Sequence, residues 1–350
     1  MGNNVMRCVL LAISITLAGC GVPSDRTAAP NMAQSSRSRA QTLLFSLLHR
    51  MNGVAIRRDR RASWMAPEAK AQNLVYLSAG GADEVVVYSY PAGKKSGTLT
   101  GLHDPAGTCS DAAGDVWIVN SAEFEVVEYA HAGKKAKATL SDSGAANPLA
   151  CSVDPTTGNL AVTNLGAASG GGNLSIYTGA KGSPTKYTDP DLMFVYFCGY
   201  DDQGNLFVDG LDSAFAFVLA ELPSGSETLQ TISLSNAVGF PGGVAWDGAY
   251  VAIGDQLYKG EHKSAIYQFS VTGSTGTLEG TTALAGSCDV LQFAIPSGGS
   301  PRKAKQGNTA VAPDDCLSNA AFYHYPAGGS PTKALSGLQY PVAAAVSLAR

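Results

Sequence analysis

Hydrophobic and polar residues alternate over short segments along most of the chain from residue 74 onward. Segments such as Val116–Asn120 and Leu160–Asn164 each follow a turn that contains Asp and Gly. An alternation with a period of two residues is typical of a β-strand with one buried face. The pattern therefore predicts an all-β domain over residues 74–350.

The strands recur in a unit of about 45 residues, which is the length of a propeller blade. Each copy starts with an apolar segment that is often opened by Pro and closed by Asp, passes through a Gly-containing turn into a second strand, and adds two strands around another turn. Four short strands cannot bury both faces alone, so the units must stack in a ring. The first two strands of the five clear copies span Pro105–Asn120, Pro148–Asn164, Phe197–Asp209, Pro241–Gly254 and Cys288–Ala312.

The two ends of the domain complete one further blade. Leu74–Ser78 matches the second strand of the unit, and Pro341–Val346 matches the first. We therefore expect a six-bladed β-propeller of four-stranded blades, whose last blade is closed by the C-terminal inner strand plus three N-terminal strands, leaving no open edge. A seven-bladed alternative arises because Pro296–Lys305 imitates a turn between third and fourth strands. We interpret this segment as a long loop, since strand-length segments do not flank it on both sides.

The repeated motif, Pro-x-Gly followed by Asp-x-x-Gly-Asn/Asp and an apolar strand ending in Asn or Asp, resembles NHL-type propellers. More loosely, it is similar to the gluconolactonase-like and virginiamycin B lyase-like families. The resemblance covers residues 74–350, and its motifs specify a fold and not a chemistry. It implies either a binding module or a metal-dependent hydrolase (lactonase-like) or lyase with its site at the central channel. Gluconolactonase-like enzymes hold a divalent metal there with Glu, Asn and Asp, and no Glu occurs on an inner strand of this chain.

The N-terminus carries the features of an exported lipoprotein. Residues 1–20 combine one basic residue, a short apolar stretch and Leu17-Ala-Gly-Cys20, which resembles the bacterial lipobox. The resemblance implies that Cys20 is acylated and anchors the protein to a lipid membrane of the cell envelope; Gly21 favours the outer membrane. The alternative is an ordinary cleaved signal peptide with a Cys by chance.

Residues 21–73 form a basic tether. Leu43, Leu44, Leu47, Leu48 and Met51 recur at helical spacing and predict an amphipathic helix. An Arg-rich run, 57–61, follows this helix. The helix lies on an anionic membrane surface, or it packs on the acidic propeller or stays mobile, and the sequence does not decide among these.

Charge is divided unevenly along the chain. Residues 74–350 carry a net charge of −11, which is the −4 of the whole chain less the +7 of residues 1–73. Nucleic-acid binding needs clustered Lys and Arg, so no nucleic-acid partner is expected for the propeller. A small ligand, a glycan or an envelope protein fits better.

Polar residues recur where the second strand of each unit ends. Because equivalent strand ends lie at one face of a propeller, that face is the predicted ligand site, and the oxygens there are of the type that a divalent metal such as Ca²⁺ prefers. The alternative, which the sequence favours, is that Asn and Asp end these strands because they tolerate turn conformations. The residues concerned are Asn120, Asn164, Asp209, Asp255 and Asp314.

Five Cys follow the signal peptide and Cys20, so an oxidised chain retains at least one thiol. Cys288 and Cys316 lie at the ends of neighbouring strands of one unit and are predicted to form a disulfide. Cys151 and Cys198 share one register on adjacent inner strands; small core residues are the favoured interpretation over a thiol pair. The sequence thus predicts a membrane-tethered extracytoplasmic binding or scaffold module, with a lactonase-like or lyase enzyme as the alternative.

Overall fold

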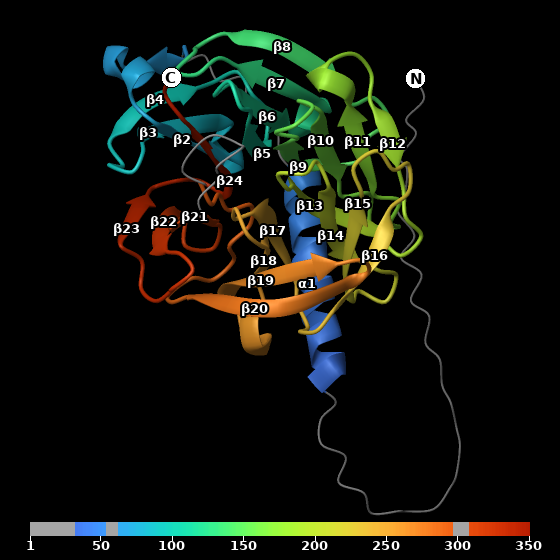
Figure 1. Ribbon diagram of the computed structural model, residues 1–350. Helices are drawn as coiled ribbons and strands as arrows, with labels where there is room; N and C mark the ends of the chain where they lie inside the picture. Colours follow the sequence, from blue (N-terminus) through green and yellow to red (C-terminus); the bar gives the residue numbers. More distant parts are fainter. Residues whose placement is uncertain (1–31, 54–61, 297–307) are drawn as a thin grey trace, which may run out of the picture.

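The chain forms a ring of β-sheets around a central axis, with one long helix packed against it (Figure 1). This computed structural model describes residues 32–53, 62–296 and 308–350. Cys20, the Arg-rich run at 57–61 and most of the expected long loop at 296–305 lie outside the described residues. The all-β, propeller-like architecture expected from the repeat is confirmed.

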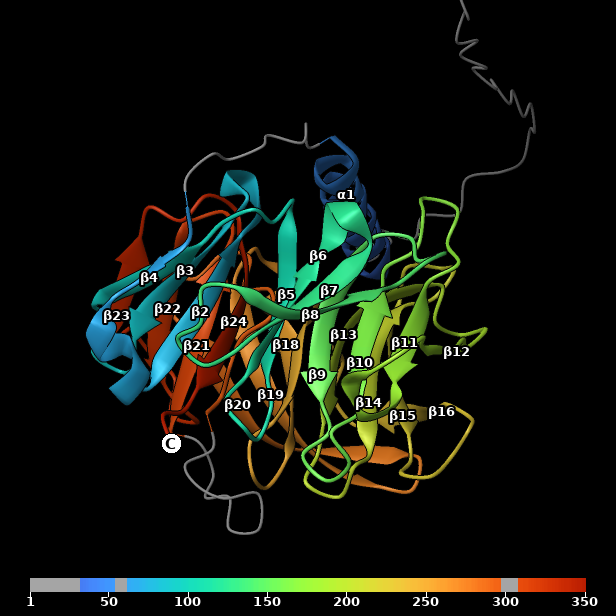
Figure 2. The same ribbon diagram turned by 90° about the horizontal axis from the view of Figure 1, so that it is seen from above.

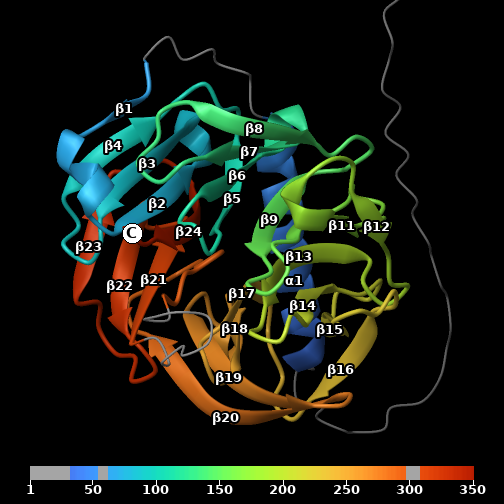
Figure 3. The ribbon, with the colours of Figure 1, turned by 45° about the horizontal axis from the view of Figure 1, so that its top comes forward.

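Within each sheet the chain runs outward from the central axis, and the strand bounds follow the repeated unit (Figure 3). The first sheet consists of β5 (Pro105–Ser110), β6 (Val116–Asn120), β7 (Glu125–Tyr129) and β8 (Ala136–Ser141). The second consists of β9 (Pro148–Val153), β10 (Leu160–Asn164), β11 (Asn173–Tyr177) and β12 (Thr185–Tyr187). The next strands are β13 (Phe194–Tyr200), β14 (Leu206–Leu211), β15 (Phe217–Leu222), β16 (Gln230–Leu234), β17 (Pro241–Trp246), β18 (Val251–Asp255), β19 (Ser264–Thr272) and β20 (Thr275–Leu284).

The C-terminal strand closes the ring against the N-terminal strands, as the sequence predicts. This sheet consists of β1 (Trp64–Met65), β2 (Leu74–Ala79), β3 (Glu84–Ser89), β4 (Lys95–Leu99) and β24 (Pro341–Ser347) in the order β1-β4-β3-β2-β24. Antiparallel pairing of β2 with β24 joins Leu74 to Ser347 at one end and Ala79 to Pro341 at the other. The two ends of the domain are therefore held in one sheet.

The described hydrogen bonding departs from six separate four-stranded sheets in three places. The short strand β1 adds a fifth strand to the closing sheet. β16 pairs in parallel with β20 through Ser233 and Leu234, which joins two sheets into one of eight strands. The sheet of β21 (Thr309–Asp314), β22 (Asn319–His324) and β23 (Lys333–Ser336) has three strands, because the segment 290–294 pairs with its neighbours only through isolated bridges.

Helix α1 (Met32–Gly53) packs on the propeller, as one of the alternatives for the tether expects. Its buried side is Ala40, Leu44, Leu47 and Leu48, and these join the main apolar cluster of the ring. Arg50 forms an ion pair with Asp315. Figure 2 shows α1 on one side of the ring and the C-terminus on the other. None of the described helices is both long and apolar enough to span a bilayer.

Five 3₁₀ turns connect the strands without changing the architecture. They span η1 (Pro67–Ala71), η2 (Gly80–Ala82), η3 (Ser121–Glu123), η4 (Thr178–Ala180) and η5 (Tyr258–Gly260).

Candidate functional site

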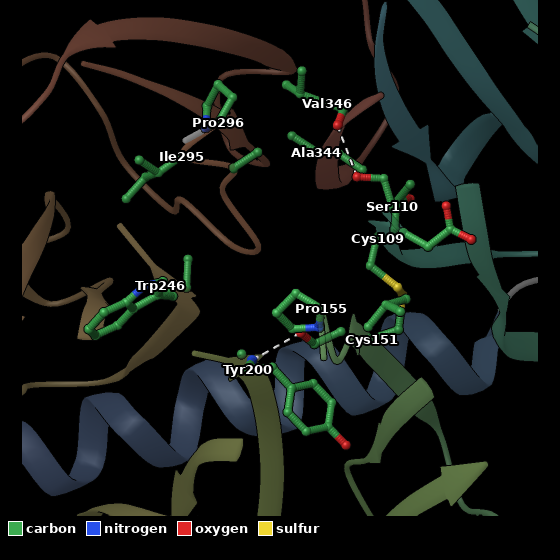
Figure 4. Close-up of a pocket in the computed structure, with 18 of the residues that line it drawn as sticks. Cys109, Ser110, Cys151, Pro155, Tyr200, Trp246, Ile295, Pro296, Ala344 and Val346 are labelled. Atoms are coloured by element: carbon green, nitrogen blue, oxygen red, sulfur yellow. Dashed lines mark hydrogen bonds between the residues drawn. A yellow bond between two sulfur atoms is a disulfide. The ribbon is translucent and has the colours of Figure 1, made fainter. Parts of the chain in front are cut away.

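A cavity of about 490 Å³ opens at the mouth of the central channel that faces away from α1. The innermost strands β5, β9, β13, β17 and β24 and the segment 292–296 all contribute lining residues, most of them near the C-terminal ends of the strands. Figure 4 shows these residues around an open centre, with α1 crossing behind them. The opposite ends of the same strands carry α1, since Leu43, Leu47 and Arg50 lie with Phe240, Leu291 and Tyr340.

Gln292 closes the inner end of this cavity by reaching across the channel. Its side chain accepts a hydrogen bond from the Thr108 backbone N at 3.3 Å and donates to the Thr108 carbonyl at 3.2 Å and the Cys151 carbonyl at 3.1 Å. It is 6% exposed. Because one side chain satisfies backbone groups on β5 and β9 from the far side of the ring, it fixes the spacing of three inner strands.

A disulfide between Cys109 and Cys151 lies beside Gln292 and joins β5 to β9, with a Cα–Cα distance of 5.7 Å. The interpretation of Cys151 and Cys198 as a thiol pair is therefore wrong, because Cys151 has a different partner. Cys198 is a free, buried thiol, and burial raises its pKa well above the usual range, so the nucleophilic thiolate is disfavoured.

The walls of the cavity combine main chain and small side chains with the larger side chains of Tyr200, Trp246 and Phe293. Ser110 Oγ donates to the Val346 carbonyl at 2.9 Å, and Ser152 Oγ accepts from the Tyr200 backbone N at 3.1 Å. These hydroxyls bridge neighbouring inner strands, as the dashed lines in Figure 4 show. Apolar surface between them comes from Pro155, Ile295, Pro296 and Val346.

Two acidic residues at the rim of the cavity, Asp111 and Asp201, accept hydrogen bonds from the backbone of their own turns. Asp111 Oδ1 accepts backbone hydrogen bonds from Ala113 at 2.8 Å and Asp115 at 2.9 Å. Asp201 Oδ1 accepts equivalent bonds from Gln203 and Asn205. Partial burial raises the pKa of Asp111. None of the described lining residues is a His, and Asp111 and Asp201 accept hydrogen bonds within their own turns.

The five residues predicted as ligands lie at the other face and are all buried, with at most 2% exposure. Four of them accept hydrogen bonds from main chain that lies within, or a few residues before, the neighbouring inner strand or segment. Asn120 Oδ1 accepts from His103 N at 2.6 Å, Asp209 Oδ1 from Phe197 N at 2.8 Å, Asp255 Oδ1 from Phe240 N at 3.1 Å, and Asp314 Oδ2 from Cys288 N at 2.7 Å. Asn164 instead donates to Asp142 at 3.0 Å. The polar residues at the ends of the second strands thus hold neighbouring main chain by hydrogen bonds. Their role in ligand binding stays a prediction.

The carboxylates of Asp209, Asp255 and Asp314 are not gathered around one point in the part of the chain that the structure describes. Among the described groups of three or more His, Cys, Asp or Glu with ligand atoms within 4.8 Å of one another, none contains two of Asp209, Asp255 and Asp314. Asp209 Oδ2 has no partner, and burial raises the pKa of this carboxyl well above its usual range, which favours its neutral form. The divalent metal implied by the gluconolactonase-like resemblance therefore does not fit these positions.

The disulfide expected between Cys288 and Cys316 is present, with a Cα–Cα distance of 6.1 Å. This disulfide lies at the face that carries α1. Asp289 follows Cys288 and Asp315 precedes Cys316, and both aspartates line the small pocket beneath the helix.

No known protein-family model matches the chain, and no curated protein matches its sequence. Solved structures are similar in fold. A chain of a nidogen/laminin complex matches with a TM-score of 0.60 and 11% identity, over 80% of this chain and 99% of that one. A protein of unknown function from Bacteroides caccae matches with a TM-score of 0.56 and 10% identity, over 79% and 99%. A functionally unknown protein from Desulfotomaculum acetoxidans matches at 0.53 and 12%, over 85% and 92%. Such low identities establish the β-propeller fold alone.

Proposed function

We propose that this chain is an envelope lipoprotein whose six-bladed, NHL-like propeller binds a small, largely apolar ligand in the cavity at the channel mouth. The observation that carries the proposal is the cavity itself. Its volume of about 490 Å³ lies within the range of small-molecule sites, and its lining combines apolar side chains with polar groups such as those of Ser110 and Gln292. One end is open, and Gln292 and α1 close the other.

The count of six blades follows if the segment 290–294 is taken as an inner strand. It bridges β21 in antiparallel fashion at Val290 and Ala294, and it bridges β24 in parallel at Gln292. These are the neighbours that an innermost strand has in a propeller. With this strand counted, and β16 and β20 assigned to separate blades, each blade contains four principal strands.

Export is supported by the two disulfides, since such bonds persist in oxidising compartments such as the bacterial periplasm. Acylation of Cys20 would anchor the protein to a membrane through the tether. The helix within the tether packs on the face opposite the cavity. This arrangement leaves the cavity free for a ligand from the aqueous side.

The binding proposal is tested with the neutral apolar fluorophore N-phenyl-1-naphthylamine and the purified mature protein. Saturable fluorescence enhancement with one site per chain is expected. Val346→Trp places a large side chain at the cavity wall and should abolish it. Phe124→Trp is the matched control, because Phe124 is 44% exposed and does not line the cavity. Equal enhancement by both variants, or none by the wild type, contradicts the proposal.

The anchoring proposal is tested separately by fractionation of cells. The wild type should partition with membranes and carry a lipid on Cys20 that mass spectrometry detects. Cys20→Ser should release the protein or stall its maturation. Unchanged partitioning of the variant together with an unmodified Cys20 in the wild type would overturn it.

A further inference from the structure

Three separate segments bring metal-binding side chains together around the Cys288–Cys316 disulfide. His262 lies in the loop between β18 and β19, Asp289 follows Cys288 in the chain that leads to the inner segment, and Cys316 follows β21. The His262 Nδ1, the Cys288 Sγ and a carboxylate oxygen of Asp289 lie within 4.8 Å of one another. Cys288, Cys316 and Asp314 form a second such group that shares the Cys288 sulfur.

This set differs in kind from an acidic cluster. It contains two sulfurs, an imidazole and a carboxylate, and Zn²⁺ is commonly held by four ligands of these types in a tetrahedron. His262 Nδ1 and Asp289 Oδ1 are 3.4 Å apart, a spacing that two ligands of one zinc ion have. Asp314 is not counted among the four ligands, because its carboxylate accepts hydrogen bonds from the backbone N of Cys288, Asp289 and Leu317. It therefore orients the loop that carries the ligands.

We propose that Cys288, Cys316, His262 and Asp289 form a zinc site in the reduced chain, so that the disulfide and the metal exclude each other. A small dithiol supplies two electrons and two protons to the Cys288–Cys316 sulfurs and is itself oxidised to a disulfide. Zn²⁺ then replaces the two thiol protons, which are released to water. The site is remote from the cavity and does not depend on the ligand proposed above.

Accessibility separates this disulfide from the other one. Cys316 is exposed, and the His262 side chain is 53% exposed, so a reductant and a hydrated metal ion reach both. Cys109 and Cys151 are 8% and 1% exposed. Exposed disulfides are the ones that exchange readily with small thiols, whereas buried ones resist reduction. The Cys288–Cys316 bond is therefore the one suited to a reversible exchange with a metal.

The test uses the mature protein reduced with a phosphine, which does not chelate zinc, and kept without oxygen. After Zn²⁺ addition and removal of the excess, elemental analysis should find one zinc per reduced chain and none retained by the oxidised chain. Co²⁺ in its place should give a thiolate-to-cobalt charge-transfer band and the visible bands of tetrahedral cobalt.

Variants distinguish this site from adventitious binding. Cys288→Ser and His262→Ala should weaken zinc binding by more than about 100-fold, since loss of an outer-shell partner alone costs about 10- to 100-fold. Cys198→Ser and His324→Ala are the matched controls and should bind zinc as the wild type does. The double variant Cys109→Ser/Cys151→Ser should also retain the site.

His262→Ala is the decisive variant, because its exposed side chain can be removed without disturbing the core. Circular dichroism of each reduced variant establishes that it is folded before zinc is added. If the folded, reduced wild type retains no zinc, or if His262→Ala binds it with unchanged affinity, the proposal is overturned.

Discussion

The two mouths of the central channel are formed by opposite ends of the same inner strands, yet one is filled and the other is open. Near α1 the ring contains large, fully buried side chains, among them Tyr196, Phe197 and Phe240, and Leu44 of the helix packs with them. At the open mouth the same strands present small residues such as Ser110 and Gly199 beside the larger Tyr200 and Trp246. The packing of α1 fills one mouth, and the cavity lies at the other.

The difference also separates two kinds of polar residue. At the filled mouth, buried Asn and Asp side chains bind the main chain of their own sheet and fix where each inner strand begins. At the open mouth, hydroxyls, Gln292 and a disulfide link one inner strand to the next. Local bonds fix each sheet, and bonds between sheets fix the width of the channel.

The largest expected effect is on the open mouth. The double variant Cys109→Ser/Cys151→Ser removes a crosslink with a sequence separation of 42, and it should lower the free energy of unfolding by about 4 kcal/mol in the chain-entropy model. Denaturant titration measures this loss. The cavity should also widen, because β5 and β9 lose their covalent link and keep only the Gln292 hydrogen bonds and their mutual packing there. An unchanged unfolding midpoint would show that the inner strands do not need the crosslink.

Leu44→Ala tests the filled mouth. Leu44 is fully buried against the ring, so its truncation should cost about 3 kcal/mol if α1 unfolds with the propeller. Phe45→Ala is the matched control, since Phe45 directly follows Leu44 on the helix and is 46% exposed. Thermal unfolding compares the two variants. If both variants unfold at the same temperature as the wild type, α1 does not contribute to the stability of the propeller.

The sequence predicts the ring but not which mouth is open. The repeat locates the strands well: the expected segments Val116–Asn120 and Leu160–Asn164 are β6 and β10. The closure by β24 also follows from a pattern that is local in the chain. The cavity depends instead on five strands and the segment 292–296, which are far apart in sequence, and on the place where α1 packs. No local pattern contains that information.

The cysteines illustrate the same limit. Cys288 and Cys316 lie at the ends of strands of one unit, so their pairing can be predicted from the repeat. Cys109 and Cys151 belong to different sheets and stand two and three residues before Asp111 and Asp154, respectively. Their pairing depends on the stagger between adjacent inner strands, which is a tertiary property. The register shared by Cys151 and Cys198 is therefore a misleading guide to contact.

The smallest expected effect concerns charge at the edge of the filled mouth. Asp104 is 2% exposed, and burial, followed by the nearby Asp83, raises its pKa to about 7 from 3.8. The folded chain therefore binds this proton more tightly than the unfolded chain between pH 4 and 7, and stability should fall as the pH rises through that window. Above it, the folded chain carries the full cost of a buried carboxylate.

Asp104→Asn removes this cost while keeping the shape of the side chain. The residue has a φ of +50°, a conformation that Asn adopts readily. At pH 8 the variant should be more stable than the wild type by about 2 kcal/mol, because each unit of pKa shift corresponds to about 1.4 kcal/mol and the amide replaces only part of the local interactions. The gain should vanish near pH 4, where Asp104 is protonated in both states. Unfolding at a series of pH values measures this, with the exposed Asp191→Asn as control. A pH dependence that is the same in all three proteins would show that Asp104 keeps an ordinary pKa and that the filled mouth tolerates its charge.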